Sequence, residues 1–203
     1  EYDGSSWSAG GALIISRYGA GGTGTQDAAL AFGGDTVGNG SFTNATEEYN
    51  GSTWSAGGAM SANKSNQGAA GTQNTGLAIG GRTPTVLSNT EEYNGSSWTT
   101  VAGLSVGRFN LRAAGTQQSA LAIGGQNPTA LASVENYNGI AWSAETNMLF
   151  PRFILARAGT STEALAFGGY PGSVSNTSTQ FNVTNPVNCG LQCFWNSLSY
   201  TTT

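Results

Sequence analysis

GTQNTGLAIGG at residues 71–81 decides the fold, because close copies of it occur at three other places in the chain. The copies are GTQDAALAFGG at 24–34, GTQQSALAIGG at 115–125 and GTSTEALAFGG at 159–169. From copy to copy the glycine doublet advances by 47, 44 and 44 residues, and such a period is typical of a repeat architecture. The doublets, which we expect to end the second strand of each unit, are Gly33 and Gly34, Gly80 and Gly81, Gly124 and Gly125, and Gly168 and Gly169.

A second motif keeps the same spacing and pairs a Tyr with a Trp five residues later. Between the two aromatic residues lies Asn-Gly, or Asp-Gly in the first copy, which predicts a hairpin with a type I′ turn. The motif occurs at 1–7, 47–54, 91–98 and 135–142. Its aromatic pairs are Tyr2 and Trp7, Tyr49 and Trp54, Tyr93 and Trp98, and Tyr137 and Trp142.

A basic residue stands sixteen residues before each glycine doublet, and this position holds four of the seven basic residues of the chain. We expect these side chains to be structural and to pair with carboxylates or backbone carbonyls between neighbouring units. The alternative is direct binding of phosphate or sulfate by the ring of four. The residues are Arg17, Lys64, Arg108 and Arg152.

Each unit predicts four short strands. The first is expected over Leu13–Tyr18 or Phe153–Ala156, the second ends at the glycine doublet, and the third and fourth carry the Tyr and the Trp. No segment keeps a 3.6-residue period, so we expect essentially no helix. The second strands are small and apolar on both faces, which is typical of inner strands between neighbouring sheets. A unit of about 45 residues cannot bury both faces of its sheet alone, so neighbouring units must stack on it.

The order of these motifs resembles the Kelch repeat: a basic residue opens the unit, a glycine doublet ends the second strand, and Tyr and Trp follow. The resemblance covers residues 1–181, with repeat phrases at 1–7, 24–54, 71–98, 115–142 and 159–181. It implies an all-β propeller of four-stranded blades, with about 4.5 repeats in this chain. The nearly identical, Asn/Gly/Thr-rich copies also resemble Kelch-like repeats in structural proteins of tailed bacteriophages, especially phages of marine bacteria and cyanobacteria.

The ends of the chain depart from the repeat. The chain opens in mid-repeat, and in the fourth unit Phe181 and Pro186 stand at the Tyr and Trp positions. Residues 182–203 follow no repeat. The favoured interpretation is that they complete the blade begun by residues 1–7 and close a five-bladed ring, whereas the alternative is a piece of a larger propeller. Cys189 and Cys193 permit a local disulfide, but two free thiols are the preferred interpretation.

The composition excludes several classes of function. The 203 residues include seven Lys+Arg, eleven Asp+Glu and no His, giving a net charge of −4. We therefore expect no nucleic-acid surface, and the sequence has no apolar run that could span a membrane. Some Kelch-type propellers hold a copper ion through His and Tyr ligands, but this chain has no His, so the resemblance implies no copper site here. We expect neither a metal nor a cofactor. The low charge density leaves little repulsion between copies and favours an assembly.

The recurring carboxylates offer one enzymatic hypothesis. A pair of them could in principle hydrolyse glycosides. We expect a structural role instead, because they recur at one strand position in every unit, and we expect no enzyme. The residues concerned are Glu47 and Glu48, Glu91 and Glu92, and Glu135.

The loops after the glycine doublets vary while the framework repeats, which is typical of binding loops on a rigid scaffold. Their first residues, Asp35, Arg82, Gln126 and Tyr170, are the candidate binding residues. Drift in exposed loops is the alternative, and a calcium site at Asp35 is not repeated in the other units. We expect a structural or interaction module in a phage virion, as a fibre, decoration or tail-associated protein that contacts virion proteins or identical copies. The alternative is a secreted or cell-surface propeller that binds glycans.

Overall fold

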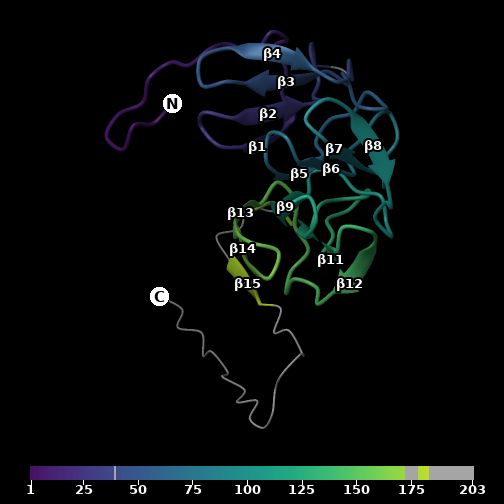
Figure 1. The fold of residues 1–203 in the computed structure, drawn as a ribbon. Helices are drawn as coiled ribbons and strands as arrows, with labels where there is room; N and C mark the ends of the chain where they lie inside the picture. Colours follow the sequence, from purple (N-terminus) through teal and green to yellow (C-terminus); the bar gives the residue numbers. More distant parts are fainter. Residues whose placement is uncertain (39, 172–177, 183–203) are drawn as a thin grey trace.

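The computed structural model describes residues 1–38, 40–171 and 178–182, and every regular element in these ranges is a β-strand. The strands form three four-stranded antiparallel sheets and one three-stranded sheet, each from consecutive segments of the chain. Figure 1 shows the sheets side by side around a common centre, as the blades of a propeller. The all-β propeller is therefore confirmed, but the described residues form four blades and not the expected five.

The strands are short and follow one another outward from the centre of the propeller (Figure 1). Blade one contains β1 (Gly21–Gly24), β2 (Ala29–Phe32), β3 (Thr46–Tyr49) and β4 (Trp54–Gly57). Blade two contains β5 (Gly68–Gly71), β6 (Gly76–Ile79), β7 (Thr90–Tyr93) and β8 (Trp98–Val101). Blade three contains β9 (Arg112–Gly115), β10 (Ala120–Ile123), β11 (Val134–Tyr137) and β12 (Trp142–Glu145). Blade four contains β13 (Ala156–Gly159), β14 (Glu163–Phe167) and β15 (Ser178–Asn182).

The first strand of each blade differs from the sequence prediction. Residues 13–18 form no strand, and β1 begins three residues later, at Gly21. The innermost strands consist mainly of Gly and Ala because they lie where the blades crowd together. A Cβ atom at Gly21 would lie 2.4 Å from the Phe32 ring. Because these strands need small side chains, they lack the alternating large apolar residues by which a strand is predicted from sequence.

The second strands end at the glycine doublets, as the sequence predicts, and each doublet comes directly after the last residue of its strand. The strand β6 stops at Ile79, and Gly80 and Gly81 come after it with φ of 58° and 101°. This left-handed backbone turns the chain out of the sheet and aims the N–H of Gly81 at the Arg108 carbonyl, 2.9 Å away. The second glycines of the other doublets have positive φ as well: Gly34 at 112°, Gly125 at 102° and Gly169 at 88°.

The outer hairpin differs in detail from the prediction too. Tyr93 pairs directly with Trp98, so four residues connect β7 to β8. The prediction of a two-residue type I′ turn at Asn94 and Gly95 is therefore wrong. Asn94 instead closes the loop through its side chain, whose Oδ1 accepts the N–H groups of Ser96 and Ser97 at 3.0 and 2.9 Å. Gly95 has a φ of 89°, in the left-handed region that favours glycine.

The hydrophobic core lies between the blades. Leu30 and Phe32 on β2 pack against Ala78 on β6 and Tyr93 on β7, and similar clusters join blades two to three and three to four. The second strands β6 and β10 are buried at all four of their positions. Each blade therefore depends on its neighbours for stability, as expected of a repeat protein.

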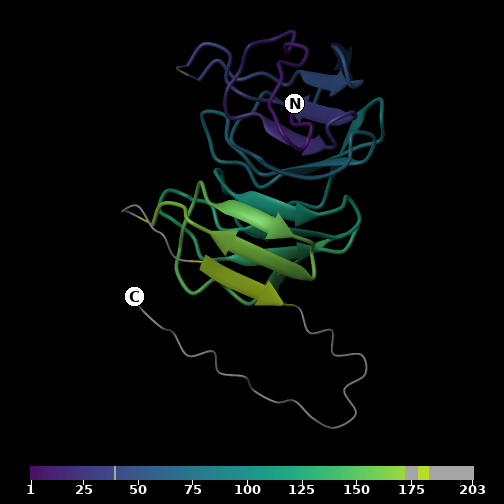
Figure 2. The same cartoon turned by 90° about the vertical axis from the view of Figure 1, so that its left-hand side faces the viewer.

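The two ends of the row of blades are less complete. Residues 1–7 form a single antiparallel bridge, Tyr2 with Trp7, instead of two full strands. At the other end β13 is exposed along its length, and β14 buries only Ala164 and Ala166; Figure 2 looks onto this face of blade four. The fifth blade expected from closure is not formed by the described residues. Residues 183–203, which include Pro186, Cys189 and Cys193, lie outside them.

Candidate functional site

The side chains of the recurring basic residues are buried, and three of these residues, Lys64, Arg108 and Arg152, join their blade to the one before it. Lys64 Nζ lies 2.7 Å from Glu91 Oε1 in blade two, while the Lys64 backbone carbonyl accepts the N–H of Gly34 in blade one at 2.9 Å. Arg17 pairs with Glu47 in the same way, and Arg108 Nη2 lies 3.1 Å from Glu135 Oε1. These positions place the cations inside the framework, away from any phosphate or sulfate in solution.

Burial controls the charges of the Lys64–Glu91 pair. It lowers the pKa of Lys64, and the charge of Glu91 offsets this only in part. Burial alone would raise the pKa of Glu91, but the charge of Lys64 and hydrogen bonds from Lys64 and Ser61 outweigh it and lower that pKa. Glu91 is therefore ionised at neutral pH and unsuited to act as a general acid.

Blade four has no carboxylate at the equivalent strand position, because Thr179 stands where the other blades have Glu91 and Glu135. Arg152 nevertheless remains buried, and its Nη1 donates to the Gly168 carbonyl at 2.9 Å. The backbone carbonyl of Arg152 also accepts the N–H of Gly125 in blade three at 3.0 Å. The link from each basic residue to the preceding glycine doublet therefore persists in blade four.

The second glutamate of each Glu-Glu pair accepts a hydrogen bond from a tyrosine of the next blade. Tyr93 donates its hydroxyl proton to Glu48, and Tyr137 donates to Glu92 at 3.0 Å. Burial, reinforced by the bond to Glu48, raises the pKa of Tyr93 to about 12. Adjacent strand residues point to opposite faces of a sheet, so Glu47 and Glu48 cannot converge on one substrate. Their arrangement favours two structural contacts over a catalytic pair.

The tryptophans add a further link between blades. Trp98 Nε1 donates to Thr46 Oγ1 at 2.8 Å, and the Trp98 ring meets the Phe32 ring edge-on at 4.9 Å. Trp142 makes the equivalent bond to Thr90 at 3.0 Å. Trp7 differs, because 81% of it is exposed.

The four candidate binding residues occupy one equivalent position in their blades. Each forms an isolated antiparallel bridge with a residue seventeen positions earlier, at the end of the propeller where the variable loops lie. The bridges are Tyr18 with Asp35, Ser65 with Arg82, Phe109 with Gln126, and Phe153 with Tyr170.

Asp35 is unsuited to bind a ligand. It is buried, and its carboxylate accepts N–H groups from Gly38 and Gly40 at 3.0 and 2.9 Å and the Tyr18 hydroxyl at 3.1 Å. Burial would raise the pKa of Asp35, but these hydrogen bonds outweigh it and lower the pKa. The carboxylate therefore holds its own loop in place. In the described residues no three His, Cys, Asp or Glu side chains gather into a possible metal site.

The other candidates lie among aromatic rings. The guanidinium of Arg82 sits over Phe109 at 5.0 Å and near Phe42 at 6.0 Å from the ring centroid. Tyr170 is exposed and packs edge-on against Phe153 at 5.4 Å, whereas Gln126 is half-buried. We call this surface the loop face, defined by Tyr18, Phe42, Arg82, Phe109, Phe153 and Tyr170.

A shallow cavity of about 320 Å³ lies beside Phe42 on the loop face, lined also by Asn63, Thr83 and Pro84. Its size reaches the lower end of the range for small-ligand pockets. An aromatic side chain beside amide and hydroxyl groups suits a polar ligand with flat apolar surfaces, such as a sugar.

Comparison with known protein families and with curated protein sequences finds no match. The described residues contain no helix long and apolar enough to cross a membrane.

Sequence reasoning missed two groups of residues. The glutamine of G-T-Q links blades, since Gln73 Nε2 donates to the carbonyls of Ala29 and Tyr49 at 3.1 and 2.5 Å. Arg112 and Arg157 line a cavity at the propeller centre. The available signal was a break in the repeat, because both arginines stand where other blades have Gly or Ala.

Proposed function

We propose that the chain is a non-enzymatic Kelch-like propeller that serves as a structural or interaction component of a bacteriophage virion. The observation that carries this proposal is the division between framework and loop face. Recurring buried ion pairs stabilise the blades, whereas sequence variation gathers at one end, around Arg82 and the exposed rings of Tyr18 and Tyr170. A rigid frame with one variable face suits a protein that contacts a partner.

The virion assignment rests on the resemblance of the repeats to phage structural proteins and on the low charge density. Partners would be other virion proteins or identical copies of the chain, in a fibre, decoration or tail-associated assembly. Mass spectrometry of purified particles, from the phage whose genome encodes this chain, should detect it with the known structural proteins. Its absence from particles in which those proteins are detected would contradict the assignment.

Glycan binding by a secreted or surface protein is the second candidate function, and the loop face favours it. Tyr170 and the Phe42 cavity offer stacking surfaces, with hydroxyl and amide groups beside them. On a glycan array, replacing residues 83–85 and 127–129, within loops 82–90 and 126–134, with Gly/Ser segments should abolish binding, because these changes leave Thr90 of β7 and Val134 of β11 in place. Replacing the exposed residues Ser96 and Ser97 at the opposite end of a blade is the matched control and should leave binding intact.

We also propose that residues 1–8 take part in closing the ring. Glu1 accepts the Tyr49 hydroxyl, as Glu48 and Glu92 accept those of Tyr93 and Tyr137. Residues 1–7 thus contact blade one as each blade contacts the next, through a Glu that accepts a Tyr hydroxyl of the following blade. Hydrogen exchange of blade four, described below, tests closure.

A further inference from the structure

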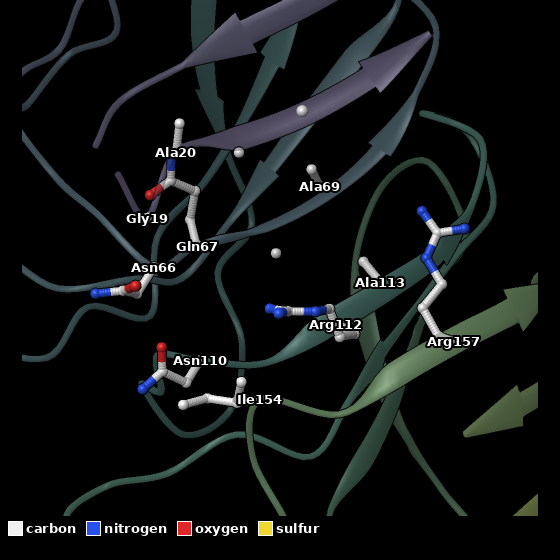
Figure 3. Close-up of a pocket in the computed structure, with 13 residues that line it drawn as sticks. Gly19, Ala20, Asn66, Gln67, Ala69, Asn110, Arg112, Ala113, Ile154 and Arg157 are labelled. Carbon is white, nitrogen blue, oxygen red and sulfur yellow. The ribbon is translucent and has the colours of Figure 1, made fainter. Parts of the chain in front are cut away.

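A cavity of about 450 Å³ lies at the centre of the propeller, where the inner strands β1, β5 and β9 and the start of β13 approach one another (Figure 3). Its volume falls within the range of small-molecule pockets. A second cavity continues toward the other end of the same strands, and Gly22 and Arg157 line both.

Four equivalent residues surround one end of this central cavity, each in the left-handed backbone region. These residues are linked in a row by backbone hydrogen bonds. The N–H of Asn66 donates to the Gly19 carbonyl at 2.7 Å, and the N–H of Asn110 donates to the Asn66 carbonyl at 2.8 Å. The N–H of Ile154 donates to the Asn110 carbonyl at 3.0 Å. Ile154 has a φ of 52°, which is unfavourable for a β-branched residue. Such backbone outliers often occur at functional sites.

Two arginines enter the cavity and break the repeat. Arg112 is the first residue of β9, where other blades have Gly21, Gly68 or Ala156. Arg157 is the second residue of β13, and its equivalents are Gly22, Ala69 and Ala113. Figure 3 shows both side chains extending from their strands into the region of the cavity. Small residues on the neighbouring inner strands leave room for them.

The cavity carries positive charge without a matching carboxylate. Among the described residues that line it, none is Asp or Glu. Arg112 donates to the Leu111 carbonyl at 3.1 Å, which leaves its positive charge unneutralised. Burial, and then the nearby charge of Arg157, lowers the pKa of Arg112. The two cations repel each other, so an anion between them would relieve an unfavourable interaction.

We propose that the central cavity binds a phosphate or sulfate group between the guanidinium groups of Arg112 and Arg157. A planar guanidinium offers paired N–H donors that match the oxygen atoms of such an anion. The amides of Asn66 and Asn110, at the mouth, can contact the molecule that carries the group. The site shares no residue with the loop face, and the inference does not depend on the proposed function.

Calorimetric titration of the full chain with sodium sulfate and sodium phosphate, against sodium chloride at equal ionic strength, tests the site. Arg112→Ala and Arg157→Ala give residues found at equivalent positions in other blades, so both variants should fold. Each should raise the Kd for sulfate by about 10- to 100-fold, the effect of losing a charged hydrogen-bonding group. The double variant should not bind, and Arg157→Lys should bind more weakly than the wild type.

Ser143→Glu is the matched control, because it changes the net charge by the same amount at an exposed position of the outer strand β12, outside the cavity, and should leave the Kd unchanged. Titration with glucose 6-sulfate and glucose separates two sources of the anion. Tighter binding of the ester than of free sulfate supports a sulfated or phosphorylated sugar, and equal binding supports the free ion. Wild-type affinity in the double variant, or no preference for sulfate and phosphate over chloride, would overturn the proposal.

Discussion

At the scale of single residues, the Glu-Glu dipeptide joins three blades with two neighbouring side chains. Glu91 pairs with Lys64, whose backbone contacts blade one, and Glu92 accepts the Tyr137 hydroxyl from blade three. The two carboxylates leave β7 on opposite faces of the sheet, so each can serve a different contact. The Glu91-Glu92 dipeptide thus connects the units on both sides of it.

The Lys64–Glu91 pair allows a direct measurement of this framework. Lys64→Met should lower the free energy of unfolding by about 3–5 kcal/mol, because it leaves the Glu91 carboxylate buried without its cation. Denaturant unfolding followed by tryptophan fluorescence measures the loss. The double variant Lys64→Met/Glu91→Leu should recover most of it, since no buried charge remains. A loss below about 1 kcal/mol in the single variant would show that water reaches Glu91.

Tyr93 gives the protein a dependence on alkaline pH. Its pKa rises from 10.0 to about 12 on folding, so the folded state holds the phenol proton more tightly than the unfolded state. This contribution to stability is complete below pH 10 and is lost as the pH rises toward 12. Unfolding curves at several pH values should show a smaller alkaline loss in Tyr93→Phe. Tyr170→Phe, at an exposed site, should behave as the wild type, and an unchanged loss in Tyr93→Phe would contradict this origin.

At the scale of elements, the outer strand of each blade is tied to its neighbour by its tryptophan. Trp98→Ala should lower the free energy of unfolding by about 3 kcal/mol, because it removes contacts with Phe32 and the bond to Thr46. Trp7→Ala is the matched control and should cost less than about 0.5 kcal/mol, since that side chain is mostly exposed. Equal losses in the two variants, measured by denaturant unfolding, would refute this account of the interface.

The sequence predicts some elements well and others poorly, for physical reasons. The second, third and fourth strands carry their own apolar and aromatic pattern, as in Leu77, Tyr93 and Trp98, so local rules find them. The innermost strand does not, because Gly and Ala at its positions reflect crowding from other blades. The same limit applies to the central cavity: the break in the repeat at Arg157 is visible in the sequence, but its proximity to Arg112 depends on how blades three and four pack.

At the scale of the whole molecule, contacts between the inner strands run from each blade to the next: β1 with β5, β5 with β9, and β9 with β13. Stability in such a row is a sum of blade and interface contributions, so a blade covered on one side should open first. Blades two and three have neighbours on both sides. Blade four has an open face in the part of the chain described, with Leu165 and Phe167 exposed.

Hydrogen exchange followed by mass spectrometry should therefore rank the blades. Amides of β6 and β10, whose residues are all buried, should exchange most slowly, and in an open row those of β13 and β14 should exchange most rapidly among the strands. The ranking depends on whether the ends of the chain close the ring, because closure would cover the open face of blade four. Protection of β13 equal to that of β5 would contradict an open row and support closure. Deleting residues 1–8 should then expose β13 to rapid exchange, whereas in an open row the deletion should affect mainly blade one.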